Sequence, residues 1–188
     1  MITTDSYLTQ IYEGCLRNER KYQELFYKLL APRMMAVCMR YAKDKDEAQD
    51  ILQEGFVKLF RNLHTYRGEG SLEGWIRRIM VYSAISRYRK ARTMVLVDDF
   101  GDDSHVLTGT SRNGNTLEAA DILSLVQELP ETYRAVFNMY AIEGYSHQEI
   151  GESLGISELL SLTTLHRARG VLKDRIKEVE ERELHLAS

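Results

Sequence analysis

GYSHQEIGESLGISE, residues 144–158, contains the start of one helix, a turn and the start of a second helix. Ser146 and Glu149 have the spacing of a capping box, in which each side chain accepts a hydrogen bond from the other residue's backbone N–H. Gly155 allows a tight turn after the first helix, and Ser157 is placed to cap the second. A helix, a short turn with glycine and another helix together predict a helix-turn-helix motif.

The remainder of the chain is also predicted to be helical. Of 188 residues only 12 are Gly and 2 are Pro, too few turn residues for a fold with many strands. Apolar residues recur at i, i+3 and i+4 over residues 7–41, 46–60, 72–88 and 117–140. Pro32 either interrupts the helix that crosses it or begins a new turn. We therefore expect an all-α protein.

Residues 93–117 break this periodicity and contain four Asp, one Arg and many Gly, Ser and Asn. A structureless segment of this length is uncommon inside one compact domain. We therefore expect two small helical domains, residues 1–92 and 118–188, joined by a flexible acidic linker over residues 93–117.

Charge is distributed unevenly between these segments. Residues 1–92 carry 17 Lys and Arg against 11 Asp and Glu, whereas residues 118–188 carry 7 against 13. No acidic residue occurs between Gly74 and Val97, where arginines alternate with Trp75, Tyr82 and Tyr88. A run of charge is usually only a solvated helix face. Cations alternating with aromatic rings favour binding of single-stranded nucleic acid, by phosphate neutralisation and base stacking.

Nothing in the sequence supports a catalytic or metal site. Asp50, Gln53 and Glu54 share the polar side of one helix, but no His, Ser or Cys accompanies them, and the five His lack metal-ligand spacing. Cys15 and Cys38 lie in apolar stripes, which argues against a disulfide scaffold or a zinc cluster. There is no apolar run of about 20 residues and no signal sequence, so we expect a cytoplasmic protein without membrane insertion.

Three sets of motifs resemble, in order, conserved regions of the bacterial extracytoplasmic-function (group 4) sigma factors of the sigma-70 family. DEAQDILQEGFVKLF at residues 46–60 looks like the region 2 helix, and YRGEGSLEGWIRRI at residues 66–79 resembles the promoter-melting element that follows it. LPETYRAVF at residues 129–137, the stretch 144–158 and LHRAR at residues 165–169 are similar to region 4. The resemblance covers residues 20–92 and 118–175. It implies a region 2 helical bundle over residues 1–92 and a region 4 domain over residues 118–188, with a helix-turn-helix at residues 146–169 and a C-terminal helix extension.

The resemblance implies a sigma factor, a dissociable polymerase subunit that initiates transcription at promoters and is neither an enzyme nor dependent on a cofactor. The residues that would dock on the β′ clamp of core RNA polymerase are Asp50, Gln53 and Glu54. The residues that would contact -10 promoter DNA are Tyr66, Arg67, Ser71, Arg77, Arg78, Tyr82, Arg87, Tyr88, Arg89 and Lys90. The residues that would contact the -35 element are Ser157, Glu158, Leu162, Thr163, His166, Arg167 and Arg169. The β flap and an anti-sigma factor are the further partners that the family implies.

The chain departs from the family pattern at several positions. Tyr82 stands where the family usually has Asn, and Ser86 where it often has Asp. At residues 159–164 the chain reads LLSLTT in place of a run that is typically Gly-Thr-x-Lys-Ser-Arg/Gln. Leu159 and Leu162 should face the DNA groove, so we expect weak or altered -35 recognition.

Two alternatives stay open, and the leucines at residues 159–162 motivate the second. The first is a helix-turn-helix regulator that binds operators without polymerase, which would dimerise and bind DNA by itself. The second is an interaction protein with altered -35 readout, whose leucines a partner would cover.

Overall fold

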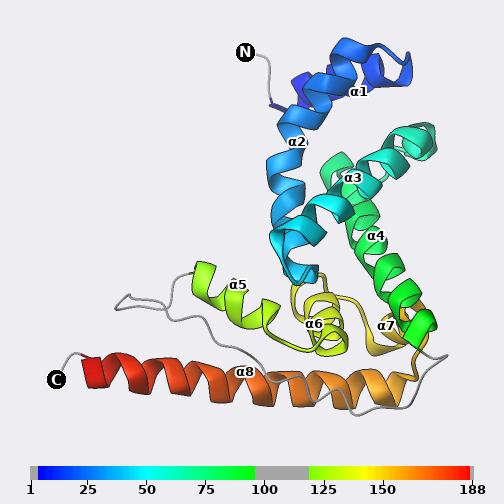
Figure 1. The fold of residues 1–188 in the computed structure, drawn as a ribbon. Helices are drawn as coiled ribbons and strands as arrows, with labels where there is room; N and C mark the ends of the chain where they lie inside the picture. Colours follow the sequence, from blue (N-terminus) through cyan, green and yellow to red (C-terminus); the bar gives the residue numbers. More distant parts are fainter. Residues whose placement is uncertain (1–3, 96–118, 187–188) are drawn as a thin grey trace. The chain divides into compact units, whose positions relative to one another are not determined.

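The computed structural model describes residues 4–95 and 119–186, and all regular structure within these two ranges is helical (Figure 1). The expected all-α fold is thereby confirmed. The predicted linker residues 96–117 lie outside the described residues. The chain divides into two compact units, residues 1–84 and 85–188. None of the described helices is long and apolar enough to cross a membrane.

The described residues of the first unit form helices and one short 3-10 turn. They are α1 (Thr4–Leu16), α2 (Arg20–Tyr41), α3 (Lys45–Asn62), η1 (Leu63–Thr65) and α4 (Leu72–Val95), of which α4 continues into the second unit. Helix α2 packs against both α1 and α3. The largest fully buried side chains are Ile11, Phe26, Leu30, Met34, Leu59, Ile76, Met80 and Val81. This apolar interior holds the outer faces of α3 and α4 in place.

Helix α2 continues without a break through Pro32, which corrects the expectation that this residue interrupts the helix or begins a new turn. Proline removes one backbone donor and one helical hydrogen bond. Burial of Leu30 and Met34, on either side of the proline, offsets that loss. Helix α3 begins as its acidic first turn indicates, because the Asp44 carboxylate accepts a hydrogen bond of 2.8 Å from the Glu47 backbone N–H.

The second unit contains the described helices that follow the linker. They are α5 (Ala119–Gln127), α6 (Glu131–Phe137), the π-helical turn η2 (Asn138–Ile142), α7 (His147–Leu154) and α8 (Glu158–Leu186). Helices α5, α6 and α7 all pack on α8. The core cluster contains Leu125, Val126 and Leu129 from the α5 segment and Ala168 and Leu172 from α8.

Helix α8 runs well beyond Arg169, where the second helix of the motif was expected to end. Val171, Leu172 and Ile176 pack on the core cluster beside α5. The extension therefore completes the core of the second unit.

The helix-turn-helix forms with the predicted local chemistry. The Glu149 backbone N–H donates to the Ser146 hydroxyl, and the Ser146 N–H donates to the Glu149 carboxylate at 2.8 Å. Gly155 adopts a left-handed conformation with φ of 68°. The Ser157 hydroxyl accepts from the Leu160 N–H at 3.1 Å, as a helix cap does.

Candidate functional site

The outer face of α3 carries the three residues predicted to bind a protein partner. Asp50 and Gln53 are exposed and Glu54 is half-buried, while the opposite face of the helix is buried in the core. Val57 lies one turn further along the same face and is 49% exposed. Val57 was missed by the sequence analysis, although an apolar residue seven positions after Asp50 and outside the buried stripe was a usable signal.

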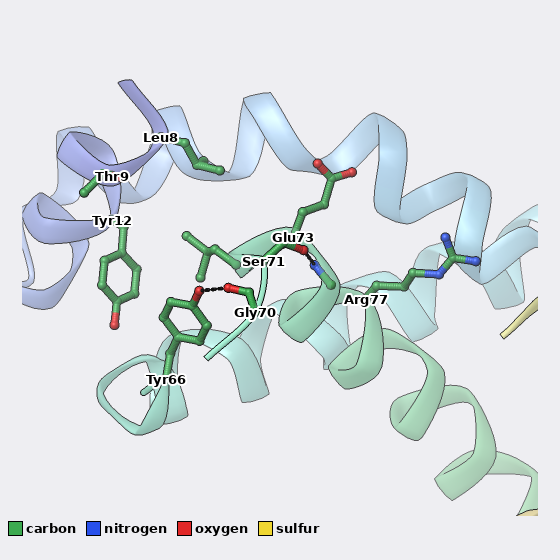
Figure 2. Close-up of a pocket in the computed structure, with 10 residues that line it drawn as sticks. Leu8, Thr9, Tyr12, Tyr66, Gly70, Ser71, Glu73 and Arg77 are labelled. Atoms are coloured by element: carbon green, nitrogen blue, oxygen red, sulfur yellow. Dashed lines mark hydrogen bonds between the residues drawn. The ribbon is translucent and has the colours of Figure 1, made fainter. Parts of the chain in front are cut away.

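A pocket of about 660 Å³ lies between α1, the loop over residues 66–71 and the first turns of α4 (Figure 2). Its lining includes Tyr66, Ser71 and Arg77, so three of the residues predicted to contact -10 DNA are brought together. Helix α1 contributes Leu8, Thr9 and Tyr12. These three were missed, because nothing in the sequence pairs α1 with a loop more than 50 residues away.

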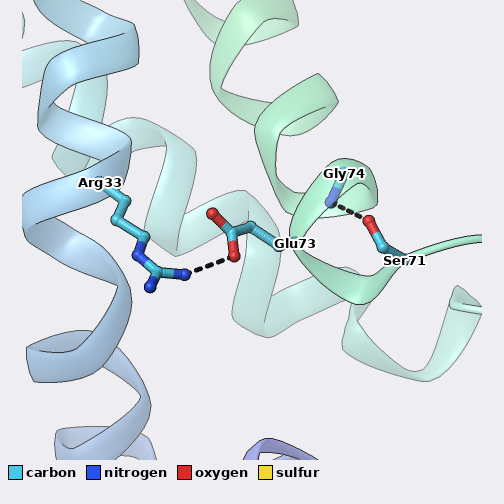
Figure 3. Close-up of polar contacts among 4 residues, drawn as sticks. All are labelled: Arg33, Ser71, Glu73 and Gly74. Carbon is cyan, nitrogen blue, oxygen red and sulfur yellow. Dashed lines mark hydrogen bonds and ion pairs between the residues drawn. The ribbon is translucent and has the colours of Figure 1, made fainter. Parts of the chain in front are cut away.

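Short-range hydrogen bonds fix the loop that forms one wall of the pocket. The Tyr66 hydroxyl donates to the Gly70 carbonyl at 2.8 Å. The Ser71 hydroxyl accepts from the Gly74 N–H at 3.0 Å, at the start of α4 (Figure 3). The Arg33 guanidinium on α2 contacts the Glu73 carboxylate at 2.7 Å, and this ion pair ties α2 to the same turn of α4 (Figure 3).

Aromatic rings line up behind this loop. The rings of Tyr12 and Tyr66 meet edge to face with centroids 5.8 Å apart, and those of Tyr66 and Trp75 are 5.4 Å apart. The Tyr12 hydroxyl donates to the Leu63 carbonyl at 3.1 Å. Burial raises the pKa of Tyr12, and the neighbouring Tyr66 raises it further, so the Tyr12 phenol stays neutral. Tyr12, Tyr66 and Trp75 thus form a row of aromatic rings. Two of these rings line the pocket together with the cation Arg77.

Helix α4 carries the remaining predicted -10 residues in different environments. Arg78 and Tyr82 lie one turn apart, and both are exposed, Tyr82 by 50%. Arg89, Lys90 and the loop residue Arg67 are also exposed, whereas Arg77 and Arg87 are half-buried. Tyr88 belongs to the second unit and is buried there. Tyr82 therefore offers an accessible ring beside an accessible guanidinium.

In the first turns of α8, three leucines lie outside and two hydroxyl residues lie inside. Leu159, Leu160 and Leu162 are 70%, 43% and 51% exposed, whereas Ser161 and Thr164 are buried. The other predicted -35 residues Ser157, Glu158, Thr163, His166, Arg167 and Arg169 are exposed.

A polar cluster holds α7 against α8. His147 Nδ1 lies 3.0 Å from the Ser161 hydroxyl, and the His147 ring stacks on Tyr140 with centroids 4.6 Å apart. The Arg169 guanidinium lies 5.6 Å from the centre of the Tyr140 ring. Arg169 is thus held beside the motif by a cation–π contact.

Neither cysteine takes part in these sites. Cys15 and Cys38 are buried and free, and burial raises the pKa of the first to about 11 and of the second to about 12. Among the described residues, no group of three or more His, Cys, Asp or Glu could hold a metal ion.

Comparisons with known proteins assign a family to both halves of the chain. The model for sigma-70 region 2 matches residues 26–93, and the model for sigma-70 region 4 matches residues 119–172. The chain is 29% identical to the ECF RNA polymerase sigma factor SigE of Mycolicibacterium smegmatis over 153 residues, 77% of this chain and 57% of that protein's length. It is 30% identical to the RNA polymerase sigma factor SigZ of Bacillus subtilis over 135 residues, 71% of this chain and 75% of that protein.

A solved structure shares the fold. It is the sigma factor RpoE of Bartonella quintana, determined in complex with the anti-sigma factor NepR. The likeness has a TM-score of 0.51 with 19% sequence identity and covers 82% of this chain and 96% of that one.

Proposed function

Because the chain belongs to the extracytoplasmic-function sigma factors of the sigma-70 family, we propose that it binds core RNA polymerase and directs promoter recognition and DNA melting. The observation that carries this proposal is the combination of a pocket at the start of α4 with exposed Arg78 and Tyr82 further along the same helix. Both this tyrosine and this arginine, and the loop and α4 wall of the pocket, lie within the region 2 match. Duplex opening in this scheme needs no covalent chemistry, so the chain acts as a polymerase subunit without cofactor. It would work in the cytoplasm, where bacterial RNA polymerase is found.

Melting would be driven by capture of bases that have left the duplex. Stacking of a base on an aromatic side chain contributes roughly 1–3 kcal/mol, comparable to the cost of unstacking one base. Tyr82 supplies an accessible ring, and Arg78 beside it supplies charge for the phosphates. The pocket bordered by Tyr66, Ser71 and Arg77 would hold an unstacked base.

Docking on polymerase would use the outer face of α3. Asp50, Gln53 and Glu54 provide acceptors and an amide on one side of a helix whose other side is buried, and exposed Val57 adds an apolar contact. A small apolar centre within a polar rim is the usual composition of a transient protein interface. The surface suits the β′ clamp as partner. We also propose an anti-sigma factor as a regulatory partner, as in the related complex from Bartonella quintana, and the β flap as the partner of the second unit.

The decisive experiment is run-off transcription by core RNA polymerase from a template with a pre-melted bubble. We expect transcript only when the chain is added, together with co-elution of chain and core on gel filtration. A chain that does not co-elute with core and instead binds duplex DNA alone as a dimer would be a helix-turn-helix regulator, and the proposal would be wrong.

A further inference from the structure

The outward face at the start of α8 has an unusual composition for a helix that enters a DNA groove. Leu159 and Leu162 are 70% and 51% exposed. Between them, the buried position is taken by the hydroxyl residue Ser161. Stability alone favours the opposite arrangement, with leucine inside and serine outside. The arrangement therefore points to a ligand for the leucines.

The rotation of α8 is fixed, so the leucines cannot turn inward. The Ser161 hydroxyl is held 3.0 Å from His147 Nδ1 on α7. Ala168, two turns further along the same side, is fully buried in the core cluster. Leu159 and Leu162 are consequently presented on the side of the motif that faces away from α7.

Thr163 extends this apolar surface. Its hydroxyl lies 3.1 Å from both the Leu159 and the Leu160 carbonyl oxygens and donates to the helix's own backbone. The residue is exposed. With the hydroxyl turned to the backbone, the methyl group is the part of Thr163 left to meet a ligand beside the two leucines.

The charge around this face is complementary to a polyanion. Residues 118–188 contain 13 Asp and Glu, but none lies between Glu158 and Asp174. His166 and Arg167 are exposed one to two turns beyond the leucines. The face thus combines apolar leucines with the cation Arg167 beyond them, inside an otherwise acidic domain. Duplex DNA fits this combination, because its groove floor carries apolar methyl groups and its edges carry phosphates.

We propose that Leu159 and Leu162 read thymine methyl groups in the major groove of the upstream promoter element, while Arg167 contacts phosphate. This rests on the proposed sigma-factor function and names the base chemistry that its second unit selects. The thymine C5-methyl is the one apolar group that B-DNA presents in the major groove. A base edge with only polar groups would lose its water against leucine without gaining a hydrogen bond, which disfavours guanine and cytosine there.

The test measures binding of holoenzyme to a library of DNA molecules. The holoenzyme is reconstituted from the full chain and core RNA polymerase. Each DNA has a randomised upstream duplex joined to a fixed pre-melted bubble, and bound molecules are sequenced. We expect enrichment of thymine at two or more adjacent upstream positions. The best binder is then made again with deoxyuridine at those positions, which removes the methyl groups and nothing else. Burial of one methyl corresponds to about a fourfold change in affinity, so each substitution should weaken binding by about that factor.

Four variants connect the effect to the helix. Leu159→Ala and Leu162→Ala should abolish the difference between thymine and deoxyuridine. Leu160→Ala is the matched control: this leucine is 43% exposed but lies about 100° around the helix from Leu159, so the difference should persist. Leu162→Lys should bind all sequences more tightly and with a steeper salt dependence, because it adds one phosphate contact.

Because each template contains the pre-melted bubble, a failure of this inference can be distinguished from a failure of the proposed function. Transcription from the bubble without thymine enrichment, or with equal affinity for thymine and deoxyuridine, would overturn the inference and leave the leucines as a surface for a protein. Absence of any transcript from the bubble would instead contradict the sigma-factor function itself.

Discussion

The carbonyl oxygen of Ile156 lies 2.8 Å from the point where a Cβ on Gly151 would stand. The Ile156 N–H also donates to the Gly151 carbonyl at 3.0 Å, so the turn of the helix-turn-helix folds directly over this glycine. The close neighbour is backbone, which cannot rotate away as a side chain can. Residue 151 must therefore lack a side chain for α7 and α8 to meet as they do.

Gly151→Ala should destabilise the second unit. Overpacking typically costs about 1–3 kcal/mol, more than the gain of about 1 kcal/mol from replacing glycine by alanine in a helix. Gly170→Ala is the matched control, because a Cβ there meets nothing within 4 Å, and it should stabilise α8 by about 0.5–1 kcal/mol. Hydrogen exchange of peptides from α7 and α8 measures both. Equal effects of the two substitutions would contradict the close approach.

The effect of Gly55→Ala on the stability of the first unit should change sign when Met80 is also replaced by alanine. A Cβ on Gly55 would overlap the Met80 sulfur, and Met80 is fully buried. Gly55→Ala should therefore destabilise the native chain but stabilise the Met80→Ala variant by about 1 kcal/mol, where it fills space and favours the helix. Trp75 is the single tryptophan, so its fluorescence during urea unfolding follows this unit. A Gly55→Ala effect of the same sign in both backgrounds would refute the contact.

Charge reversal on α3 should weaken the complex with core polymerase. Removing one partner of a buried charge pair at an interface typically costs about 2–5 kcal/mol, so Asp50→Lys should lower affinity at least tenfold. Glu24→Lys makes the same charge change on α2, at an exposed carboxylate that pairs with exposed Arg20, and should have little effect. Fluorescence anisotropy of labelled chain with core polymerase gives both affinities. If Glu24→Lys weakened binding as much, net charge rather than the α3 face would control docking.

The ring of Tyr82 should matter for opening the duplex and not for transcription after opening. Tyr82→Ala should reduce promoter melting by the equivalent of roughly 1–3 kcal/mol, whereas Tyr82→Phe, which keeps the stacking surface, should melt normally. Permanganate reactivity of unpaired thymines reports melting on duplex promoters. Transcription from a pre-melted bubble should be close to normal for both variants. Equal loss for Phe and Ala would show that the hydroxyl, not stacking, is used.

The two buried thiols should resist modification in the folded chain and make it sensitive to alkali. Burial raises the pKa of Cys15 to about 11 and of Cys38 to about 12, above the unfolded value of about 8.5, so the folded chain holds protons that the unfolded chain releases. This contribution to stability is complete below pH of about 8.5 and is lost as the pH rises toward the folded values.

Urea unfolding between pH 7 and 10 measures this loss, and a Cys15→Ala, Cys38→Ala double variant should lose less stability over the same range. At pH 8 a thiol-specific reagent should modify the native chain only on the timescale of unfolding. Rapid labelling of either cysteine in the native chain would contradict its burial.

Local signals predicted the helix-turn-helix and much of the first unit. The capping box of Ser146 and Glu149 depends on residues three positions apart, so spacing alone locates it. At the start of α3 the capping contact is equally local, because the Asp44 carboxylate accepts from the Glu47 N–H three positions away. Pro32 shows the limit of such rules, because burial of the α2 face outweighs a local helix breaker.

The sequence by itself determined that the chain is helical, where α3 and α7 begin, which residues share the cationic helix, and that the outward leucines of α8 depart from the family pattern. These properties depend on neighbours within about one helical turn, and hydrogen bonding and periodicity act over that range. Tertiary structure alone decided that α1 joins the loop at Tyr66 in one pocket, that Val57 lies exposed beside Gln53, and that Ser161 is buried against His147. The contacts among these join residues that are 14 to more than 50 positions apart. The exposure of Val57 depends on which side of α3 the core covers. Only the packed chain sets these two properties.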